Sequence, residues 1–519
     1  MQLTYLGHAG FFVETADAII VMDPWLSADG AFDSSWFQLP RNHQLAPLVH
    51  EKLRNSRKQR FVYISHEHHD HFDPAFLSSL PNKDLTYVLP NFQRAALRSA
   101  VSEYHPKALI TCDHGQEIPI PGGYLKLYLQ DSGLSRDSGV LVKTNGQSFL
   151  NLNDCKLYDE LTSVVEDQGP ISVFACQFSG ATWHPICYDY EQGEYERISQ
   201  HKIMTKFEMI ARAIETTKAR VYLPSAGPAC FLDPTLMHLN FERVNIFPRA
   251  PKFLEYLGNR LANSPTQALN LMPGDVLDVE SAQLISLGGE RVDEENIEAY
   301  LQSYAAEYRD FFVERQPKYS DRELAEILER LRIELNRKLS AFVLHDRVRV
   351  PLYFGLSDSS SAMLRVDFPR CVAELVSGIS EPDFYSLMAP SWQIARILNG
   401  EITWEDFALT FRVRLNRKPD VYQTLIQGFL LMEPEDMNWF CARLIEIEDK
   451  QNRIVVEAGG TRYSIDRYCP HQGADLSQGW LDEGNLWTCP RHRWHFAFDK
   501  GGRCLTSDAS IHSVCLEND

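Results

Sequence analysis

The chain has 519 residues, of which 44% are hydrophobic and 23% are charged, a composition typical of a folded protein rather than a disordered one. At roughly 100–200 residues per domain, this length predicts about three domains. The formal net charge of −19 excludes a general nucleic-acid or anionic-membrane binder, because both need a basic surface. The sequence has no apolar run long enough to cross a membrane and no visible signal peptide, and its eleven cysteines are few and odd in number. We therefore expect a cytoplasmic protein without a disulfide framework.

Residues 1–250 alternate short apolar strands with helical stretches, which predicts a layered α/β domain with much antiparallel content. Strands are expected at residues 61–65, 124–130, 140–144 and 148–152. The last two flank Asn145-Gly146, a dipeptide that favours a tight hairpin.

The strand at 61–65 leads into a dense group of metal-ligand residue types, His66-Glu67-His68-His69-Asp70-His71. Alternation along an extended chain places His66 and His68 on one side and leaves Asp70 and His71 able to face a second ion. Four histidines within six residues are a poor match to a solvated polar loop. Because the spacing also excludes the helical H-E-x-x-H zinc motif, we expect a metal site where the strand passes into the loop.

This cluster resembles the metallo-β-lactamase superfamily. Gly7-His8-Ala9-Gly10 and Met22-Asp23-Pro24-Trp25 are similar to the first strands of its lactonase-like and phospholipase-like branch. The resemblance covers about residues 1–250 and implies an αββα fold. It also implies that Asp154, in Asn151-Leu152-Asn153-Asp154-Cys155, bridges two metal ions.

Two histidines that hydrolytic members of the superfamily supply are absent. Asp131-Ser132-Gly133 stands at one position and Pro224-Ser225-Ala226-Gly227-Pro228 at the other. With Asp131 replacing one ligand, the candidate ligands are His66, His68, Asp70, His71, Asp131 and Asp154. A carboxylate-rich set suits iron better than the His-rich zinc site does, so we expect one or two iron ions, with zinc and manganese as alternatives. His8 and His184 are further candidates, although a structural or substrate-facing role is the simpler interpretation of each.

The central part of the chain has two characters. Residues 251–342 are charged and carry apolar residues at helical spacing, which predicts a helical spacer region. Residues 343–439 form an α+β pattern, and the stretch 391–404 with the alternating 407–415 resembles sterol-carrier-protein-2 (SCP2) type domains. The resemblance implies a substrate-binding or docking module, and a scaffold that presents the C-terminal domain is an equal alternative.

Residues 440–519 combine short strands with frequent glycine and aspartate, an all-β pattern. Two motifs there, Cys469-Pro470-His471 and Cys489-Pro490-Arg491-His492, each supply one thiolate and one imidazole. Such a set holds a [2Fe–2S] cluster, with both cysteines on one iron and both histidines on the other. A tetrahedral zinc site is the alternative, but zinc fingers usually place Cys with Cys and His with His.

The two motifs resemble the Rieske ferredoxin family. Where high-potential Rieske proteins carry an additional disulfide, this chain has Ala474 and Arg491. The resemblance therefore implies the lower-potential ferredoxin or oxygenase type. His495 is interpreted as a surface or packing histidine, because a Rieske iron takes only two imidazoles.

A redox cluster has no task in simple hydrolysis, which moves no electrons. The combination predicts a Rieske-coupled, iron-dependent monooxygenase in which the cluster passes electrons to the N-terminal metal site, where O₂ is activated. Asp70 and Asp154 would stabilise ferric charge, and with Asp131 they are the candidate catalytic carboxylates.

The chain also resembles the CMP-N-acetylneuraminate hydroxylase family at residues 131–133, 150–155, 178–181 and 223–228, with the Rieske domain last instead of first. This resemblance implies hydroxylation of a small molecule, such as a sugar nucleotide or a natural product.

Two other hypotheses stay open. The missing histidines weigh against a lactonase- or phosphodiesterase-class hydrolase with a redox-sensing Rieske domain, and the intact 66–71 cluster weighs against a non-enzymatic electron carrier.

The monooxygenase requires an external electron donor, such as a ferredoxin or a flavin- or cytochrome b5-type reductase. We expect no nucleic-acid or membrane partner, and a homo-oligomer is left open. The expected fold class is multidomain α+β, with the parts 1–250 (metallo-β-lactamase-like), 251–342 (helical spacer), 343–439 (SCP2-like) and 440–519 (Rieske [2Fe–2S]).

Overall fold

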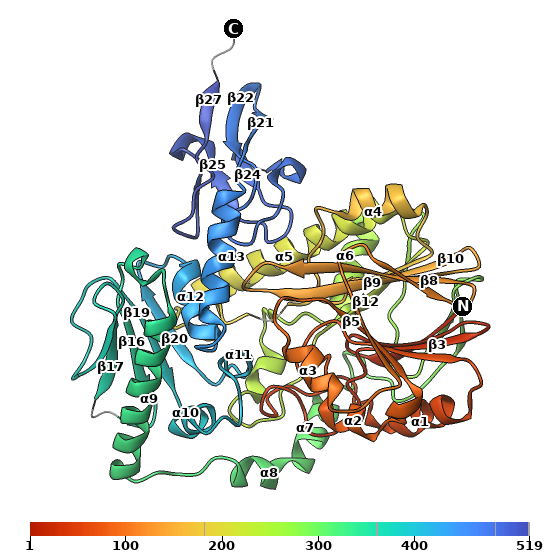
Figure 1. The fold of residues 1–519 in the computed structure, drawn as a ribbon, viewed down its shortest axis with the longest axis horizontal. Helices are drawn as coiled ribbons and strands as arrows, with labels where there is room; N and C mark the ends of the chain where they lie inside the picture. Colours follow the sequence, from red (N-terminus) through yellow and green to blue (C-terminus); the bar gives the residue numbers. More distant parts are fainter. Residues whose placement is uncertain (181, 360–361, 483, 517–519) are drawn as a thin grey trace. The chain divides into compact units, whose positions relative to one another are not determined.

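The computed structural model describes residues 1–180, 182–359, 362–482 and 484–516 (Figure 1). The chain divides into two compact units. The first comprises the described residues of 1–131, 136–181 and 196–309, and the second those of 132–135, 182–195 and 310–519. The tip of one hairpin and the segment that leads into a long helix therefore belong to the second unit, although their neighbours in sequence belong to the first.

An eight-stranded sheet forms one layer of the first unit. Its strands, in spatial order, are β15 (Gln283–Ser286), β14 (Val276–Asp278), β1 (Gln2–Gly7), β2 (Gly10–Glu14), β3 (Ala18–Met22), β4 (Gln59–Tyr63), β5 (Thr86–Pro90) and β6 (Ala108–Cys112). The pairs from β15 to β3 are antiparallel, and those from β3 to β6 are parallel. Because side chains alternate along a strand, Phe11 faces the interior between two sheets whereas Phe12 faces the helices outside.

A seven-stranded sheet forms the second layer. Its strands, in spatial order, are β13 (Gln267–Ala268), β12 (Val221–Ser225), β11 (Val173–Gln177), β10 (Gln147–Asn151), β9 (Arg136–Thr144), β8 (Gly123–Asp131) and β7 (Glu117–Ile120). Asn145 and Gly146, with φ of 48° and 79°, join β9 to β10 so that Thr144 lies opposite Gln147. This two-residue turn confirms the predicted hairpin.

The two sheets pack face to face over a shared apolar core that includes Leu3, Phe149 and Val221. Helices cover both outer faces. On the first sheet these are α1 (Ala46–Asn55), α2 (Pro74–Ser79) and α3 (Ala96–Ser102), and on the second α4 (Leu161–Gln168), α5 (Gln192–Thr217) and α6 (Ala250–Arg260). The layers are therefore helix, sheet, sheet and helix, which confirms the αββα arrangement.

The first unit continues beyond residue 250, where the sequence pattern indicated the start of a helical spacer. β14 pairs with β1, and Leu277 lies opposite Leu3 in the buried core. Strands β14 and β15 have only three and four residues, too few for their alternation to be distinguished in sequence. Helix α7 (Ile297–Glu307) follows in this unit, and all but the first residue of α8 (Arg309–Glu314) belong to the second.

The second unit begins with an α+β region. Its five-stranded sheet has the order β18 (Val372–Val376), β17 (Met363–Asp367), β16 (Leu352–Leu356), β19 (Phe384–Ala389) and β20 (Arg414–Lys418). The helices are α9 (Asp321–Ala341), α10 (Ser391–Leu398), α11 (Trp404–Leu409), α12 (Thr424–Leu431) and α13 (Met437–Asp449). Helix α9 starts with a capping box in which the side chains of Ser320 and Glu323 each accept from the other residue's backbone N–H.

The C-terminal part of the second unit consists of short strands from residue 453 onward. Residues 440–449, which the sequence pattern included in this all-β part, instead belong to helix α13. One sheet contains β21 (Arg453–Ala458), β22 (Thr461–Asp466) and β27 (Val514–Leu516), and another contains β23 (Trp480–Asp482), β24 (Leu486–Thr488), β25 (His495–Ala497) and β26 (Arg503–Cys504). Its small core includes Ile465, Phe496 and both cysteines of the C-terminal motifs, Cys469 and Cys489. Short 3₁₀ helices across the chain are η1 (His43–Leu45), η2 (Asn82–Asp84), η3 (Met237–Phe241), η4 (His345–Arg347), η5 (Leu476–Gln478) and η6 (Phe498–Lys500).

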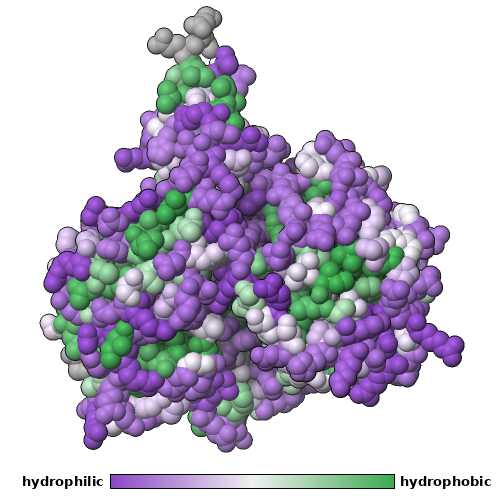
Figure 2. Space-filling model, viewed as in Figure 1, coloured by the Kyte–Doolittle hydropathy of each residue, from purple (hydrophilic) through white to green (hydrophobic). Residues whose placement is uncertain are grey.

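No helix within the described ranges is both long and apolar enough to span a membrane. On the face that Figure 2 shows, hydrophilic residues predominate and apolar residues form separate patches between them. The apolar residues are instead gathered in the cores described above, as expected for packed domains.

A buried charge in the second unit leads to a prediction about stability. Lys338 of α9 is fully buried, with Nζ 3.9 Å from the centroid of the Trp404 ring and 3.4 Å from the carbonyl oxygen of Leu430. Burial lowers its pKa to about 7, although the charge of Glu433 opposes the shift. The folded-state pKa lies below the unfolded value. The buried charge therefore lowers the free energy of unfolding fully below pH 7, and this destabilisation disappears as the pH rises toward about 10.

We expect Lys338→Met to raise the free energy of unfolding at pH 6 by about 1–4 kcal/mol, the range seen when buried charges are replaced by apolar groups. The rise in stability between pH 7 and pH 10 should disappear in the variant. Thermal unfolding across this pH range measures both effects, with the exposed Lys318→Met as the control. A less stable Lys338→Met protein would show that the contact of the ammonium group with Trp404 outweighs its burial.

Candidate metal centres

The loop that follows β4 is anchored at both ends. At its start, the backbone N–H and the hydroxyl of Ser65 donate to the carboxylate of Asp23 at 2.8 and 2.6 Å. At its end, Asp73 caps α2 by accepting from the N–H of Phe76 at 3.0 Å. These contacts hold residues 66–71 beyond the carboxyl end of β4, the edge at which α/β sheets commonly bind ligands.

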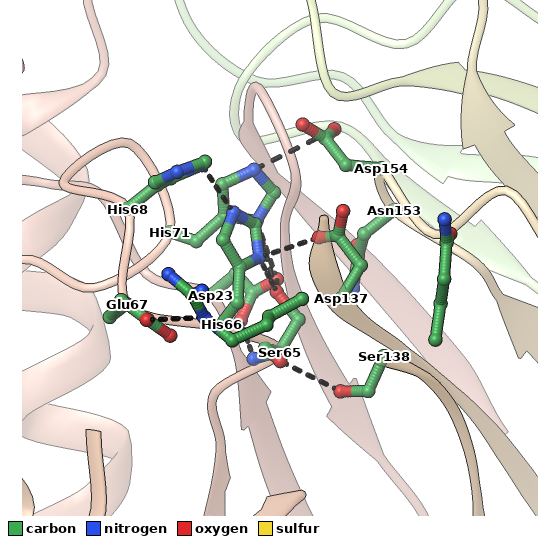
Figure 3. A network of polar contacts seen from close by, with 12 residues as sticks. Asp23, Ser65, His66, Glu67, His68, His71, Asp137, Ser138, Asn153 and Asp154 are labelled. Carbon is green, nitrogen blue, oxygen red and sulfur yellow. Dashed lines mark hydrogen bonds and ion pairs between the residues drawn. The ribbon is translucent and has the colours of Figure 1, made fainter. Parts of the chain in front are cut away.

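Two groups of candidate metal ligands come together here. One comprises His8, Asp70 and His71, and the other comprises His66, His71 and Asp154. In each group, one ligand atom per residue lies within 4.8 Å of the others. His71 Nε2 is 3.6 Å from Asp70 Oδ2 and 3.7 Å from Asp154 Oδ1, and Figure 3 shows the imidazole directed toward Asp154. His71 therefore belongs to both groups.

Several buried atoms in these groups have no hydrogen-bond partner among the described residues, namely His71 Nε2, Asp70 Oδ1 and Asp154 Oδ1. A buried polar atom without a partner is costly, so its presence requires an explanation. A metal cation would provide a partner for all three atoms. The donor set of imidazoles and carboxylates therefore fits a metal ion.

The charges of the groups also favour a cation. Burial lowers the pKa of His71, but Asp70, Asp154 and Asp23 outweigh this effect and raise the pKa to about 10. Burial raises the pKa of Asp70, but His71 and His8 hold that pKa well below its usual value. The metal-free groups thus keep a proton on His71 between carboxylates. Since a metal ion displaces that proton, metal binding should strengthen as the pH rises.

Two buried aspartates orient the imidazoles (Figure 3). Asp23 Oδ2 is 2.9 Å from His71 Nδ1, so His71 Nε2 faces the ligand groups. Asp137 Oδ1 is 3.0 Å from His66 Nδ1. Burial raises the pKa of Asp137, but His66 outweighs it and lowers the pKa to about 2. Carboxylate–imidazole pairs of this kind fix the tautomer and the ring orientation of metal-ligating histidines.

Removal of one such carboxylate is expected to weaken metal binding. We predict that Asp23→Ala lowers metal affinity in the first unit by about 10- to 100-fold, because both His71 and Ser65 lose their partner. Competition with a chelator, followed by metal analysis, measures the change. Glu51→Gln on the exposed face of α1 is the matched control. Wild-type affinity in Asp23→Ala would show that His71 does not depend on this carboxylate.

The structure brings one of the other sequence-based candidates, His68, next to a group member, and leaves Asp131 and His184 outside both groups. His68 Nδ1 is 2.9 Å from His66 Nε2, and Asp131, at the end of β8, accepts from a backbone N–H at 3.5 Å. His184 lies in the second unit, where it contacts a tyrosine hydroxyl at 2.8 Å. His8, in contrast, is a member of a ligand group, with Nε2 2.9 Å from an oxygen of Asp70.

Asp137, in β9, contacts His66, whereas the sequence indicated Asp131, the last residue of the neighbouring strand β8. Asp137 lies opposite Gln130, and Asp131 lies opposite Arg136. Directly opposite residues share one face of a sheet, and successive residues alternate. Asp131 and Asp137 therefore project from opposite faces. Nothing in the sequence distinguished Asp137, whereas Asp23 stood directly after a strand in a motif that already resembled the superfamily.

Backbone geometry marks the same strand ends. Four non-glycine residues, each within two residues of the end of a strand, have φ in the left-handed region: His8 (51°), Asp23 (38°), Asn153 (51°) and Ala226 (51°). Such conformations cost about 1–3 kcal/mol each and gather at functional sites. After β12 the chain also passes so close to Ser179 that a Cβ on Gly227 would lie 3.2 Å from its carbonyl oxygen. A side chain at position 227 would therefore be crowded by Ser179, and the positive φ of Gly227 (135°) would strain any other residue there.

In the second unit, the two cysteine–histidine loops close in the same way. In each loop the cysteine N–H donates to the carbonyl five residues later, and its carbonyl accepts from the N–H four residues later, at 2.8 to 3.0 Å. These hydrogen bonds start from Cys469 and from Cys489. Gly473 and Arg493 are the equivalent fourth residues, and both have positive φ, at 69° and 51°. The two halves of the site are thus built on one backbone pattern.

The loops bring both thiols and both imidazoles together. Cys469 and Cys489 are fully buried, and the ring centroids of His471 and His492 are 4.7 Å apart. Burial, and next the neighbouring Cys489, raise the pKa of Cys469 well above its usual value. A bound metal cation would counteract this shift by favouring the thiolate of Cys469. Two thiolates with two imidazoles fit a [2Fe–2S] cluster.

Known protein families match both ends of the chain. Residues 2–124 match the Beta-lactamase superfamily domain, and residues 429–513 match the Rieske [2Fe-2S] domain. The chain therefore combines an N-terminal metallo-β-lactamase domain with a C-terminal Rieske domain, and a Rieske [2Fe–2S] cluster is among its cofactors. Both assignments confirm the sequence predictions.

Individual relatives extend the comparison. Rieske 2Fe-2S iron-sulfur proteins of Mycolicibacterium smegmatis and Mycobacterium tuberculosis are 29% and 28% identical to this chain, each over 98% of both chains. The inactive cytidine monophosphate-N-acetylneuraminic acid hydroxylase of Homo sapiens is 24% identical over 44% of this chain and 45% of its own, which confirms the predicted resemblance to that family. Among solved structures, CmlA, a diiron beta-hydroxylase from Streptomyces venezuelae, is 14% identical, with a TM-score of 0.35 over 53% of each chain.

Proposed function

We propose that this protein is a Rieske-coupled, iron-dependent monooxygenase that hydroxylates a small-molecule substrate. The observation that carries the proposal is that one chain contains a Rieske domain and, separately, buried groups of imidazoles and carboxylates that share His71. A site that only hydrolysed its substrate would not use the cluster, because hydrolysis transfers no electrons.

The proposed metal ligands are the members of the two groups together with one remaining sequence-based candidate. They are His8, His66, His68, Asp70, His71 and Asp154, and they exclude Asp131, which projects from the sheet face opposite to that of Asp137. One imidazole nitrogen binds one ion, so His71 serves one group at a time, and the set holds one or two ions. The carboxylates make the set more suitable for iron than a histidine-rich zinc site is.

Iron bound at this site would supply the redox chemistry that reduces O₂ for insertion into a C–H bond. The chain's own residues position the ligands and balance charge. Asp70 and Asp154 offset the charge of the ion. Asp23 and Asp137 keep the imidazoles of His71 and His66 in one orientation, and His8 Nε2 lies 2.9 Å from Asp70 Oδ2.

The proposal requires a substrate and an electron donor. The substrate class is a sugar nucleotide or a natural product, a choice supported by the relative whose name is a cytidine monophosphate-N-acetylneuraminic acid hydroxylase. The donor is a ferredoxin or a flavin- or cytochrome b5-type reductase. We assign the first unit (residues 1–131, 136–181 and 196–309) to the metal-binding part, 343–439 to an SCP2-like part that binds substrate or presents the cluster, and 440–519 to the Rieske part.

Metal analysis of protein purified without oxygen, with EPR of the reduced form, tests the proposal. We expect about two iron ions per chain in the cluster, further iron in the first unit, and a product that forms from a sugar-nucleotide library only with both O₂ and reductant. Zinc in the first unit, with turnover in the absence of O₂, would establish a hydrolase instead. A first unit that binds no metal would establish an electron carrier.

A further inference from the structure

A tyrosine from outside the Rieske domain lies against one of the cluster-binding histidines. The ring of Trp494, within the domain, stacks on His471 with centroids 4.2 Å apart and an interplanar angle of 13°. Tyr422 meets the same imidazole edge-on, with centroids 5.7 Å apart and an angle of 90°. Tyr422 also contacts Trp494, at 5.6 Å. Two aromatic rings therefore enclose the imidazole of His471, which is only 8% exposed.

The backbone holds Tyr422 at this position from the side of the Rieske domain. Its N–H donates to the carbonyl oxygen of Thr506 at 2.9 Å, and its own carbonyl accepts from the N–H of Asp508 at 3.3 Å. These bonds form a parallel β-bridge to Ser507. The segment that carries Tyr422 is thus bonded to the Rieske domain through a single β-bridge, although it precedes residues 429–513, which match that domain.

The α+β region holds the same segment from the other side. Tyr385, in β19, donates from its hydroxyl to the carbonyl oxygen of Val421 and accepts at that hydroxyl from the N–H of Gln423 at 3.0 Å. One hydroxyl therefore fixes the residues on both sides of Tyr422.

The charge of the cluster determines what such a cover does. Two ferric ions, two sulfides, two thiolates and two neutral imidazoles sum to zero, and addition of one electron makes the cluster an anion. Replacing water around a ligand by an apolar ring disfavours the charged form. The enclosure of His471 therefore disfavours the reduced cluster and lowers its reduction potential, since burial and solvent exposure are among the factors that set this potential.

We propose that Tyr422 is a positioning residue that sets the reduction potential of the Rieske cluster by keeping water from His471, and that residues 421–423 make this potential depend on the α+β region. The inference relies on the Rieske domain and not on the oxygenase activity, because it concerns the cluster alone.

A redox titration of the holoprotein without substrate or O₂, followed by the EPR signal of the reduced cluster, tests the proposal. We expect Tyr422→Ala to shift the one-electron equilibrium with a mediator dye about tenfold toward the reduced cluster, which is about 59 mV. Tyr422→Phe keeps the ring and should stay within about twofold of wild type. Tyr463→Ala, which removes a ring that stacks on Phe498, is the matched control and should not shift the equilibrium.

Two outcomes would overturn the proposal. An unchanged or lower potential in Tyr422→Ala would exclude shielding by the ring, and a shift in Tyr422→Phe as large as that in Tyr422→Ala would assign the effect to the hydroxyl. If Tyr422→Ala fails to retain its cluster, Tyr385→Phe serves as the second variant. It removes both hydrogen bonds that hold residues 421–423 and should shift the equilibrium in the same direction, so a wild-type potential in Tyr385→Phe would count against the proposal.

Discussion

Replacing Cys469 with serine should abolish the EPR signal of the reduced Rieske cluster and reduce O₂-dependent product to background. The thiolate is one of four cluster ligands, and serine cannot replace it in a fully buried position next to Cys489. Without the cluster, electrons from the external donor have no route to the first unit. Iron in the first unit should remain, because its candidate ligands belong to another compact unit.

The matched control for this variant is Cys515→Ser, which alters an exposed thiol in the same domain. It should keep the EPR signal and full activity. Oxygenation that persists in Cys469→Ser with the natural donor would contradict the proposed function. A retained Rieske signal in that variant would contradict the assigned cluster ligand.

Replacing His71 with alanine is expected to produce the opposite pattern, with an intact Rieske signal and no metal retained in the first unit. His71 is a member of both ligand groups, and its Nε2 lies within 3.7 Å of two carboxylates. Loss of a residue that only supports a ligand costs about 10- to 100-fold in metal affinity or activity. We therefore expect at least a 100-fold fall in activity when this residue is removed.

His69→Ala is the matched control, because it removes an imidazole from the same loop without altering either group. Metal content and activity should stay near wild type. Full iron content in His71→Ala, measured after anaerobic purification, would place the N-terminal metal site elsewhere in the chain.

Features encoded within a few consecutive residues could be predicted from sequence. The Asn145-Gly146 turn specifies its geometry locally, because both residues have positive φ. The two C-terminal motifs do so through the same pair of backbone hydrogen bonds, made by Cys469 in one loop and by Cys489 in the other. Contacts between distant strands could not be predicted. Asp137 reaches His66 from the other sheet, and which face Asp137 occupies depends on the pairing of β8 with β9.

The membership of His8 in a ligand group could not be predicted from the sequence for a related reason. A lone histidine after the first strand resembles any buried polar residue until the topology places the ends of β1, β4 and β10 together. The sequence also does not predict the left-handed backbone at His8, Asp23, Asn153 and Ala226, because none of these residues is a glycine. Sequence thus identifies residue types suited to a metal, and the sheet pairing selects which of them meet.

The pairing of β14 with β1 has a consequence for how the protein is made. Leu277 lies opposite Leu3, so β1 receives its outer neighbour only after the chain has been synthesised through β14 (Val276–Asp278). Until then, the edge of β1 is an open template for pairing with another chain. A fragment that ends at residue 250 would keep this edge open permanently. We therefore expect such a fragment to aggregate, whereas one that extends through α7 closes the sheet with its own residues.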